Sequence, residues 1–369
     1  MRGEILKKVL ILTASAGGGH NAVSDALRQS FEERGVEVKI VDFYQQCAGP
    51  LKNWIMSTGY KLSCKYVRPI YNFCYNSKKG KANAKTSKKI LLKLKETIDA
   101  YQPDIVVAVH VFVAAALANL KRRFGVNAVT SFVVTDYCIY PYVKDVKPLD
   151  YIVLPHESFV SEFLEMGFEE GRLLVYGIPV KNNFSVYKDK SVSRQQLNLD
   201  DKFTLLVMTG GGGFGNIVSM LKHSAKAQGD YQIICINGKD KNSYKRIEKF
   251  VKKNNLGHVY NFGFVDEVHP YMQASDVMLG KCGAIALTEA LNAWVPLICK
   301  DKQISNELDN LDFLRENEAV LCYSRFGQLP TLLSELIKNQ SKLDDIKKNI
   351  LKIRKLDATN KFVDKMLSL

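Results

Sequence analysis

Residues 8–20 read KVLILTASAGGGH, and this stretch constrains the fold more than any other part of the chain. Val9–Leu12 is an apolar run that is too short for a helix and suits a buried strand. Three glycines, Gly17–Gly19, follow it, and the helical spacing of apolar residues starts at Asn21. A strand, a glycine turn and a helix bring bare backbone N–H groups to an anionic ligand. The stretch therefore predicts an α/β domain with a ligand site at its first turn.

His20 stands at the mouth of this turn. A phosphate-binding turn does not need an ionisable side chain there, whereas a proton-transfer site does, and histidine titrates near neutral pH. The alternative is that His20 only begins the helix and has no chemical role. We favour the catalytic interpretation.

Strands and helices alternate through the rest of the first half. The expected strands are 36–41, 104–109, 128–134, 151–154 and 173–176, and the expected helices include 90–101, one that runs through Arg123, and 157–166. His20, His110 and Asp136 each follow an expected strand directly. Ligands bind at the carboxyl ends of strands in open parallel sheets, so these three residues are candidate site residues.

A second α/β series begins after a predicted linker at 177–202. Its expected strands are 203–208, 231–236, 259–262, 277–279, 295–299 and 319–322, and four glycines, Gly210, Gly211, Gly212 and Gly213, follow the first of them. We predict an α/β fold of two Rossmann-like, doubly wound domains that face each other across a cleft. The expected domains are residues 1–180 and 181–354, and a last helix at about 355–369 is expected to pack on the first domain.

Length and composition set further limits. A chain of 369 residues exceeds the usual size of one hydrophobic core. No apolar run approaches the roughly 20 residues of a membrane span, and the apolar run near the start is shorter than that of a signal peptide. The eight cysteines never form a C-x-x-C pair, which suits a reducing cytoplasm and argues against a zinc ribbon.

The net charge of +14 is concentrated in one segment. Residues 43–95 contain twelve Lys or Arg, no Asp or Glu, and eight aromatic residues. Such a segment suits two partners. Basic and aromatic side chains bind nucleic acids through charge and base stacking, and they also bind anionic membranes, where the aromatic rings lie at the interface. We favour the membrane and expect no nucleic-acid partner. The expected membrane-binding residues are Trp54, Lys61, Lys65, Arg68, Lys78, Lys79, Lys81 and Lys85.

The second half carries a further anion-binding pattern. Residues 280–290 read GKCGAIALTEA, so small residues open a helix whose N–H groups suit a diphosphate, and Glu289 is placed to bind a ribose. Asn306, Glu307 and Asn310 near the start of another helix suit sugar hydroxyls, although an ordinary polar helix start explains them equally well. The chain has no D-x-D pair and no metal-ligand spacing, so we expect no metal.

Together these motifs resemble the monogalactosyldiacylglycerol synthases and the processive diacylglycerol glucosyltransferases. The resemblance rests on VLILTASAGGGH at the start, QPDIVV at 102–107, TDY at 135–137, GIPV at 177–180, TGGGG at 209–213, GKCGAIALTEAL at 280–291 and NELDN at 306–310. It implies the GT-B fold, a UDP-sugar donor held by the C-terminal half, and a lipid acceptor held by the N-terminal half. Tyr140 and Val143 stand where the family has His and Trp.

The resemblance also implies roles for individual residues. His20 is the expected general base, and Asp136 orients it or contacts the acceptor. The expected donor-binding residues are Gly18, Gly19, Gly210, Gly211, Gly212, Gly213, Phe264, Val265, Lys281, Gly283, Ala284, Ile285, Glu289, Asn306, Glu307 and Asn310.

We therefore predict a cytoplasmic enzyme, peripheral on the inner face of the cell membrane, that moves a hexose from a UDP-sugar to 1,2-diacylglycerol with inversion and without a cofactor. Three alternatives remain: a GT-B enzyme for another lipid such as a peptidoglycan intermediate, a non-catalytic UDP-sugar-binding membrane protein, and a nicotinamide oxidoreductase. The last would use the weak dinucleotide fingerprint at Gly17–Ala22. The sequence does not distinguish glucose from galactose.

Overall fold

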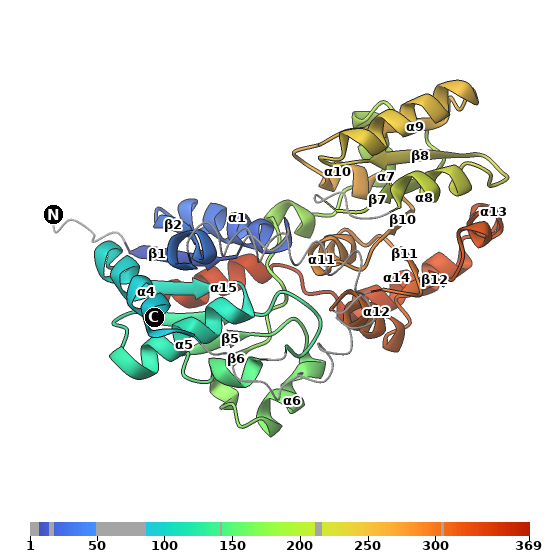
Figure 1. The fold of residues 1–369 in the computed structure, drawn as a ribbon. Coiled ribbons are helices and arrows are strands. Elements are labelled where there is room, and N and C mark those ends of the chain that lie inside the picture. Colours follow the sequence, from blue (N-terminus) through green and yellow to red (C-terminus); the bar gives the residue numbers. More distant parts are fainter. Residues whose placement is uncertain (1–6, 15–17, 49–85, 141, 211–215, 304–305) are drawn as a thin grey trace. The chain divides into compact units, whose positions relative to one another are not determined.

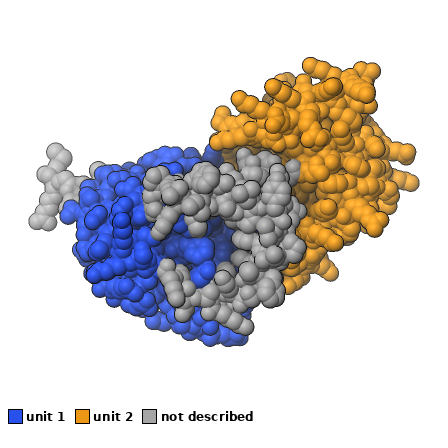
Figure 2. Space-filling view, viewed as in Figure 1, with its two compact units in different colours: residues 1–182, 304–306, 355–369 blue, residues 183–303, 307–354 orange. Residues whose placement is uncertain are grey.

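The computed structural model describes residues 7–14, 18–48, 86–140, 142–210, 216–303 and 306–369 (Figure 1). The chain divides into two compact units, coloured separately in Figure 2. Unit 1 comprises Met1–Asn182, Ile304–Asn306 and Lys355–Leu369, and unit 2 comprises Asn183–Gln303 and Glu307–Arg354. All eight expected membrane-binding residues, from Trp54 to Lys85, lie outside the described residues, as do Gly211, Gly212 and Gly213.

Unit 1 is built on a parallel sheet of six strands in the order β2-β1-β3-β4-β5-β6. The strands are β1 (Lys8–Thr13), β2 (Glu37–Asp42), β3 (Ile105–Ala108), β4 (Val129–Val133), β5 (Tyr151–Val153) and β6 (Leu173–Leu174). Val9 of β1 pairs with Val38 on one side and with Ile105 on the other. The strand order therefore reverses at β1, which is the first strand in the chain but lies inside the sheet.

Helices and short turns connect these strands. They are α1 (Gly18–Glu32), η1 (Tyr44–Ala48), α4 (Lys88–Tyr101), α5 (Val111–Phe124), η2 (Val143–Val146), η3 (Glu157–Phe159), α6 (Val160–Glu165), η4 (Glu170–Arg172) and α15 (Ala358–Leu367). The Ser87 side chain accepts the Ile90 N–H and so caps α4, which begins at Lys88, two residues before the expected start. The single helix expected at 157–166 is instead a 3₁₀ turn followed by the short α6.

The last helix of the chain packs on the first. α15 lies beside α1 (Figure 1), where Phe362 meets Phe31 edge to face with ring centroids 6.4 Å apart, and both rings are fully buried. Arg34 Nε donates to Asp364 Oδ1 at 2.8 Å, and Lys7 Nζ donates to the Leu367 carbonyl at 2.8 Å. The C-terminal segment is therefore part of unit 1.

Unit 2 contains a second parallel sheet of six strands, in the order β12-β11-β10-β7-β8-β9. The strands are β7 (Phe203–Met208), β8 (Tyr231–Ile236), β9 (Val259–Phe262), β10 (Val277–Gly280), β11 (Leu297–Lys300) and β12 (Val320–Tyr323). The first strand, β7, again lies inside the sheet with β8 on one side and β10 on the other. Both sheets confirm the doubly wound α/β architecture that the sequence predicts.

The helices of unit 2 cover both faces of this sheet. They are α7 (Lys190–Gln196), α8 (Ile217–Ser224), α9 (Lys241–Lys253), α10 (His269–Gln273), α11 (Ala284–Asn292), α12 (Asn306–Glu316), η6 (Phe326–Gln328), α13 (Leu329–Lys338) and α14 (Ser341–Ile353). Leu205, Leu221 and Leu333 join β7, α8 and α13 in one apolar cluster. Among the described helices of either unit, none is both long and apolar enough to span a bilayer.

The prediction of a linker at 177–202 is wrong in its second part. Residues 182–185 form a 3₁₀ turn, η5 (Asn182–Ser185), and α7 follows with Arg194 buried. Arg194 Nη2 lies 2.7 Å from Asp276 Oδ2, which also accepts the Thr204 N–H at 2.8 Å. Lys190 Nζ contacts the other carboxylate oxygen at 2.6 Å. The polar composition of this segment reflects a buried ion cluster that ties α7 to the sheet of unit 2.

We expect Asp276→Ala to lower the free energy of unfolding of unit 2 by about 3–5 kcal/mol, because it removes the buried carboxylate that Arg194 and Lys190 share and leaves Arg194 with the exposed Asp201 alone. Urea unfolding followed by Trp294 fluorescence tests this in a Trp54→Phe background, where Trp294 is the remaining tryptophan. The control is Asp345→Ala, which breaks an exposed pair with Lys348 and should leave the midpoint unchanged. Equal midpoints for the two variants would contradict the structural role of Asp276.

Candidate active site

The first candidate site lies where the strand order of unit 1 reverses. His20 follows β1 and His110 follows β3, the neighbouring strand across the reversal. The two imidazole rings meet edge to face with centroids 4.7 Å apart. The helix expected from Asn21 begins three residues earlier, at Gly18, so His20 lies in the first turn of α1. The sheet topology thus brings together two histidines that are ninety residues apart in the chain.

His20 is held as a neutral ring. Burial lowers its pKa below the usual value of 6.5, and the charge of Asp136 and a hydrogen bond with the Val109 backbone offset only part of that shift. A neutral imidazole at pH 7 accepts a proton, which is what a general base requires. The ring nitrogen Nδ1 lies 3.2 Å from the hydroxyl oxygen of Thr135, so the ring is also fixed in orientation.

His110 has a different function in the structure. It is the N-cap of α5, and its Nδ1 accepts the Phe112 N–H at 3.2 Å, which leaves the ring proton on Nε2. Burial and the nearby His20 hold the pKa of His110 well below its usual range. The rings of Phe112 and Tyr44 pack on His110, with centroids 5.4 Å and 6.3 Å from it. His110 therefore supports the His20 ring as a neutral neighbour.

Asp136 lies just after β4, the strand next to β3, and is buried. The Tyr140 hydroxyl donates to Asp136 Oδ2 at 2.8 Å and lies 3.1 Å from the Thr135 hydroxyl. Burial, with Asp136 as a second cause, raises the pKa of Tyr140 well above 10, so this hydroxyl keeps its proton. Asp136 thus acts on His20 through space and through a series of hydroxyl groups.

The second candidate site lies at the reversal of strand order in unit 2. Gly210 follows β7 with a φ of +81°, and β10 ends at Gly280, where an added Cβ would lie 2.7 Å from the Met208 carbonyl oxygen. A side chain at Gly280 is therefore excluded by backbone contact. Gly283 is the N-cap residue of α11, so the N–H groups that open this helix lie directly beyond the carboxyl end of β10. A helix N-terminus at this place favours an anionic ligand.

Two side chains of α12 join this helix N-terminus. Glu307 Oε1 lies 2.5 Å from Lys281 Nζ, and its other oxygen is buried with no hydrogen-bond partner among the described residues. Asn310, expected to bind sugar hydroxyls, is fully buried, and its amide donates to the Cys282 carbonyl at 2.9 Å. Asn310 thus ties α12 to the loop before α11, while Glu307 offers an acceptor oxygen beside Lys281.

The other expected donor-binding residues lie in both units. In unit 2, Ala284 and Ile285 open α11, Glu289 is partly exposed in its second turn, and Val265 and Phe264 follow β9. The Phe264 ring is 57% exposed and lies 5.4 Å from Lys239 Nζ. In unit 1, Gly18 and Gly19 form the first turn of α1, and Asn306, the first residue of α12, clusters with this unit. Their roles in donor binding stay predictions.

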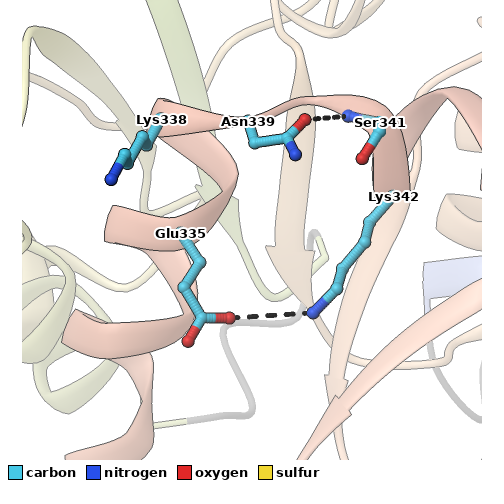
Figure 3. A pocket seen from close by; sticks show the side chains of 5 residues that line it. All are labelled: Glu335, Lys338, Asn339, Ser341 and Lys342. Atoms are coloured by element: carbon cyan, nitrogen blue, oxygen red, sulfur yellow. Dashed lines mark hydrogen bonds and ion pairs between the residues drawn. The ribbon is translucent and has the colours of Figure 1, made fainter.

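Metal-ligand clusters and a surface hollow are the other features that bear on these two sites. Within the part of the chain that the structure describes, no three His, Cys, Asp or Glu side chains are grouped as metal ligands. A hollow between α13 and α14 is lined by exposed residues only: Glu335, Lys338, Asn339, Ser341 and Lys342 (Figure 3). The Lys342–Glu335 pair across it is 3.7 Å apart and solvent-exposed. Its lining comes from α13, α14 and the loop between them, and not from the carboxyl ends of strands where both candidate sites lie.

Both halves of the chain match known families. Residues 20–180 match the family model of monogalactosyldiacylglycerol (MGDG) synthase, and residues 204–359 match the C-terminal domain of glycosyltransferase family 28. The chain is similar to the MGDG synthases in its N-terminal half and to the glycosyltransferases of family 28 in its C-terminal half, and together these matches identify it as a glycosyltransferase. The matched ranges include His20, Asp136 and the residues around α11, so both candidate sites lie within the matched regions.

Named relatives cover almost the whole of this glycosyltransferase. The processive diacylglycerol beta-glucosyltransferase of Bacillus licheniformis is 27% identical over 357 residues, which are 93% of this chain and 90% of the relative. The Bacillus subtilis protein of the same name is 24% identical over 98% of this chain and 95% of its own.

Solved structures agree on the fold. MurG of Acinetobacter baumannii has a TM-score of 0.65 and 13% identity over 98% of this chain and all of its own. Anabaena HepE in complex with UDP has a TM-score of 0.56 and 14% identity over 98% and 99% of the two chains. The fold of this glycosyltransferase is GT-B, as the sequence predicts.

Sequence reasoning missed the roles of Thr135 and Tyr140 in the glycosyltransferase. Thr135 appears in the sequence only as part of the TDY motif, and Tyr140 only as a departure from the family pattern. A signal was present, because both follow an apolar strand and lie next to Asp136. What the sequence does not contain is the direction of each side chain, which the loop after β4 sets.

Proposed function

We propose that the glycosyltransferase moves a hexose from a UDP-sugar to the free hydroxyl of 1,2-diacylglycerol, with inversion at the anomeric carbon. The observation that carries the proposal is the similarity to processive diacylglycerol beta-glucosyltransferases through both halves of the chain. The neutral His20 in one unit and the α11 N-terminus in the other supply the two chemical needs of this reaction.

In this reaction His20 takes the proton of the acceptor hydroxyl as its oxygen attacks the anomeric carbon. The bond between that carbon and the diphosphate oxygen breaks, and UDP leaves with the additional negative charge. The α11 N–H groups and Lys281 stabilise that charge in this scheme. No metal is needed in this scheme, because backbone dipoles and one cation face the leaving group.

Incubation with diacylglycerol vesicles and radiolabelled UDP-glucose or UDP-galactose tests the proposal. A labelled glycolipid whose new linkage is inverted relative to the α-linked donor supports it, and the two donors compared side by side identify the sugar. Binding of both donors without product would favour a non-catalytic protein. Transfer to a peptidoglycan lipid intermediate but not to diacylglycerol would show that the acceptor is the peptidoglycan lipid.

His20→Ala should lower kcat by about 10²–10⁴-fold while the affinity for UDP stays nearly unchanged, because a positioned base contributes that factor and UDP is held by unit 2 in this proposal. Product formation gives kcat, and calorimetry gives UDP affinity. The control is His156→Ala, a partly buried histidine at the N-cap of η3 outside both candidate sites. Near-normal turnover of His20→Ala would refute the assignment of the base.

Glu289→Ala should weaken UDP binding by about 1.5–3 kcal/mol, the usual loss for a hydrogen bond to a charged group. The proposed contacts are between its carboxylate and the ribose hydroxyls. Calorimetry with UDP and with uridine monophosphate measures the effect, and Glu248→Ala on α9 serves as the matched control in the same unit. An unchanged affinity would place the ribose contact on another residue.

We also propose that the basic and aromatic segment at 43–95 binds the enzyme to anionic membranes on the cytoplasmic side. Its first part is folded into unit 1, where Phe43 is buried, so the membrane contact is assigned to the residues from Trp54 onward. Each basic residue near an anionic surface contributes about 1 kcal/mol, and salt screens the attraction.

Replacing four lysines of this segment by Gln should release the enzyme from anionic vesicles and spare UDP binding in solution: Lys78, Lys79, Lys81 and Lys85. Vesicle sedimentation at low and high salt measures the effect. The control removes the same charge from four exposed lysines of α9: Lys241, Lys245, Lys249 and Lys252. Equal loss of binding in both variants, or tighter binding of the enzyme to RNA than to vesicles, would contradict the proposal.

A further inference from the structure

Three side chains form a continuous series with the His20 ring. His20 Nδ1 lies 3.2 Å from Thr135 Oγ1, and Thr135 Oγ1 lies 3.1 Å from the Tyr140 hydroxyl oxygen. The Tyr140 hydroxyl donates to Asp136 Oδ2 at 2.8 Å. Thr135, Asp136 and Tyr140 are 3%, 6% and 7% exposed, so water has little access to these links.

The number of protons in this series fixes its direction. An ionised carboxylate only accepts, so the single Tyr140 proton points to Asp136. The Tyr140 oxygen is then an acceptor for the single Thr135 proton, since neither hydroxyl has a second hydrogen to donate. Thr135 Oγ1 in turn accepts from His20 Nδ1. A neutral ring has one N–H, so in this order the hydrogen bond with the Val109 backbone also comes from Nδ1.

We infer that Tyr140 and Thr135 are positioning residues that hold His20 in the tautomer with its proton on Nδ1, which leaves the lone pair of Nε2 as the basic site. The inference deepens the proposed function, because it rests on His20 as the base. It also gives a role to Tyr140.

The same series responds when His20 takes a proton. The ring then carries a positive charge, and the oriented hydroxyl groups connect it to the negative charge of Asp136. Hydrogen bonds in a buried chain polarise one another, so the loss of one link weakens the whole series. The pKa of Tyr140 lies well above 10, which keeps its hydroxyl a donor throughout.

The tautomer itself is the first test. ¹⁵N NMR of the imidazole nitrogens, assigned by comparison with His20→Gln, should show Nδ1 protonated and Nε2 unprotonated in the unmodified protein near neutral pH. Tyr140→Phe and Thr135→Val should each shift the ring toward a mixture of tautomers, whereas Thr135→Ser should retain the original state. A ring protonated on Nε2 in the unmodified protein would overturn the inference, and so would an unchanged tautomer in both variants.

Tyr231→Phe is the matched control for loss of a buried tyrosine hydroxyl. The Tyr231 hydroxyl donates to the Ser224 carbonyl at 3.0 Å in unit 2, so its removal should leave the His20 tautomer unchanged. A shift of the His20 tautomer in this control would show that general destabilisation, and not the series, changes the ring.

Kinetics supply the second test. Tyr140→Phe and Thr135→Val should each lower kcat by about 10–100-fold, with little change in KM for the UDP-sugar, in the range for loss of a hydrogen bond to a charged group. The double variant should lose no more than the single ones, because each breaks the same series. Additive losses would overturn the inference. The unmodified protein could also lack transferase activity while the two variants still alter the His20 tautomer. That result would support the hydrogen-bond series and reject only the proposed function.

Discussion

The reversal of strand order in each sheet is the constraint on which both candidate sites depend. In an all-parallel sheet a crossover helix covers the end of each strand as the chain moves on to the next strand. Where β1 has β2 on one side and β3 on the other, the two crossovers run in opposite directions and leave the carboxyl ends of β1 and β3 uncovered. The same relation holds for β7 and β10 in unit 2. Backbone hydrogen bonding thus places the polar residues of both sites.

The two sites use opposite electrostatic means. In unit 1 burial lowers the pKa values of His20 and His110, so both rings are uncharged where they pack against each other. In unit 2 a helix N-terminus and Lys281 provide positive potential, and Glu307 restrains the lysine. A neutral base and an electropositive anion site are the two parts that transfer of a sugar from a nucleotide requires.

Tyr140 illustrates how a buried hydroxyl group is satisfied by its neighbours. A buried hydroxyl needs a partner, and the loop after β4 supplies two, Thr135 and Asp136, within five residues of chain. The short loop therefore orders a series of hydrogen bonds that begins at a carboxylate and ends at a histidine on a different element. The local sequence provides the hydroxyl and carboxylate groups of the series. The packing of α1 against the sheet brings His20 within reach of Thr135.

The sequence by itself determined the elements and the residues at their ends. Apolar runs such as Phe203–Met208 are buried in every residue, so composition alone identifies them as central strands. Motifs also placed His20, Asp136 and the start of α11 shortly after strands, and the structure has them there. Only the tertiary structure decided that Asn310 turns inward and that Arg194 is buried in a segment that reads as a linker. Their partners, Cys282 and Asp276, are distant in the chain, and local spacing contains no information about such contacts.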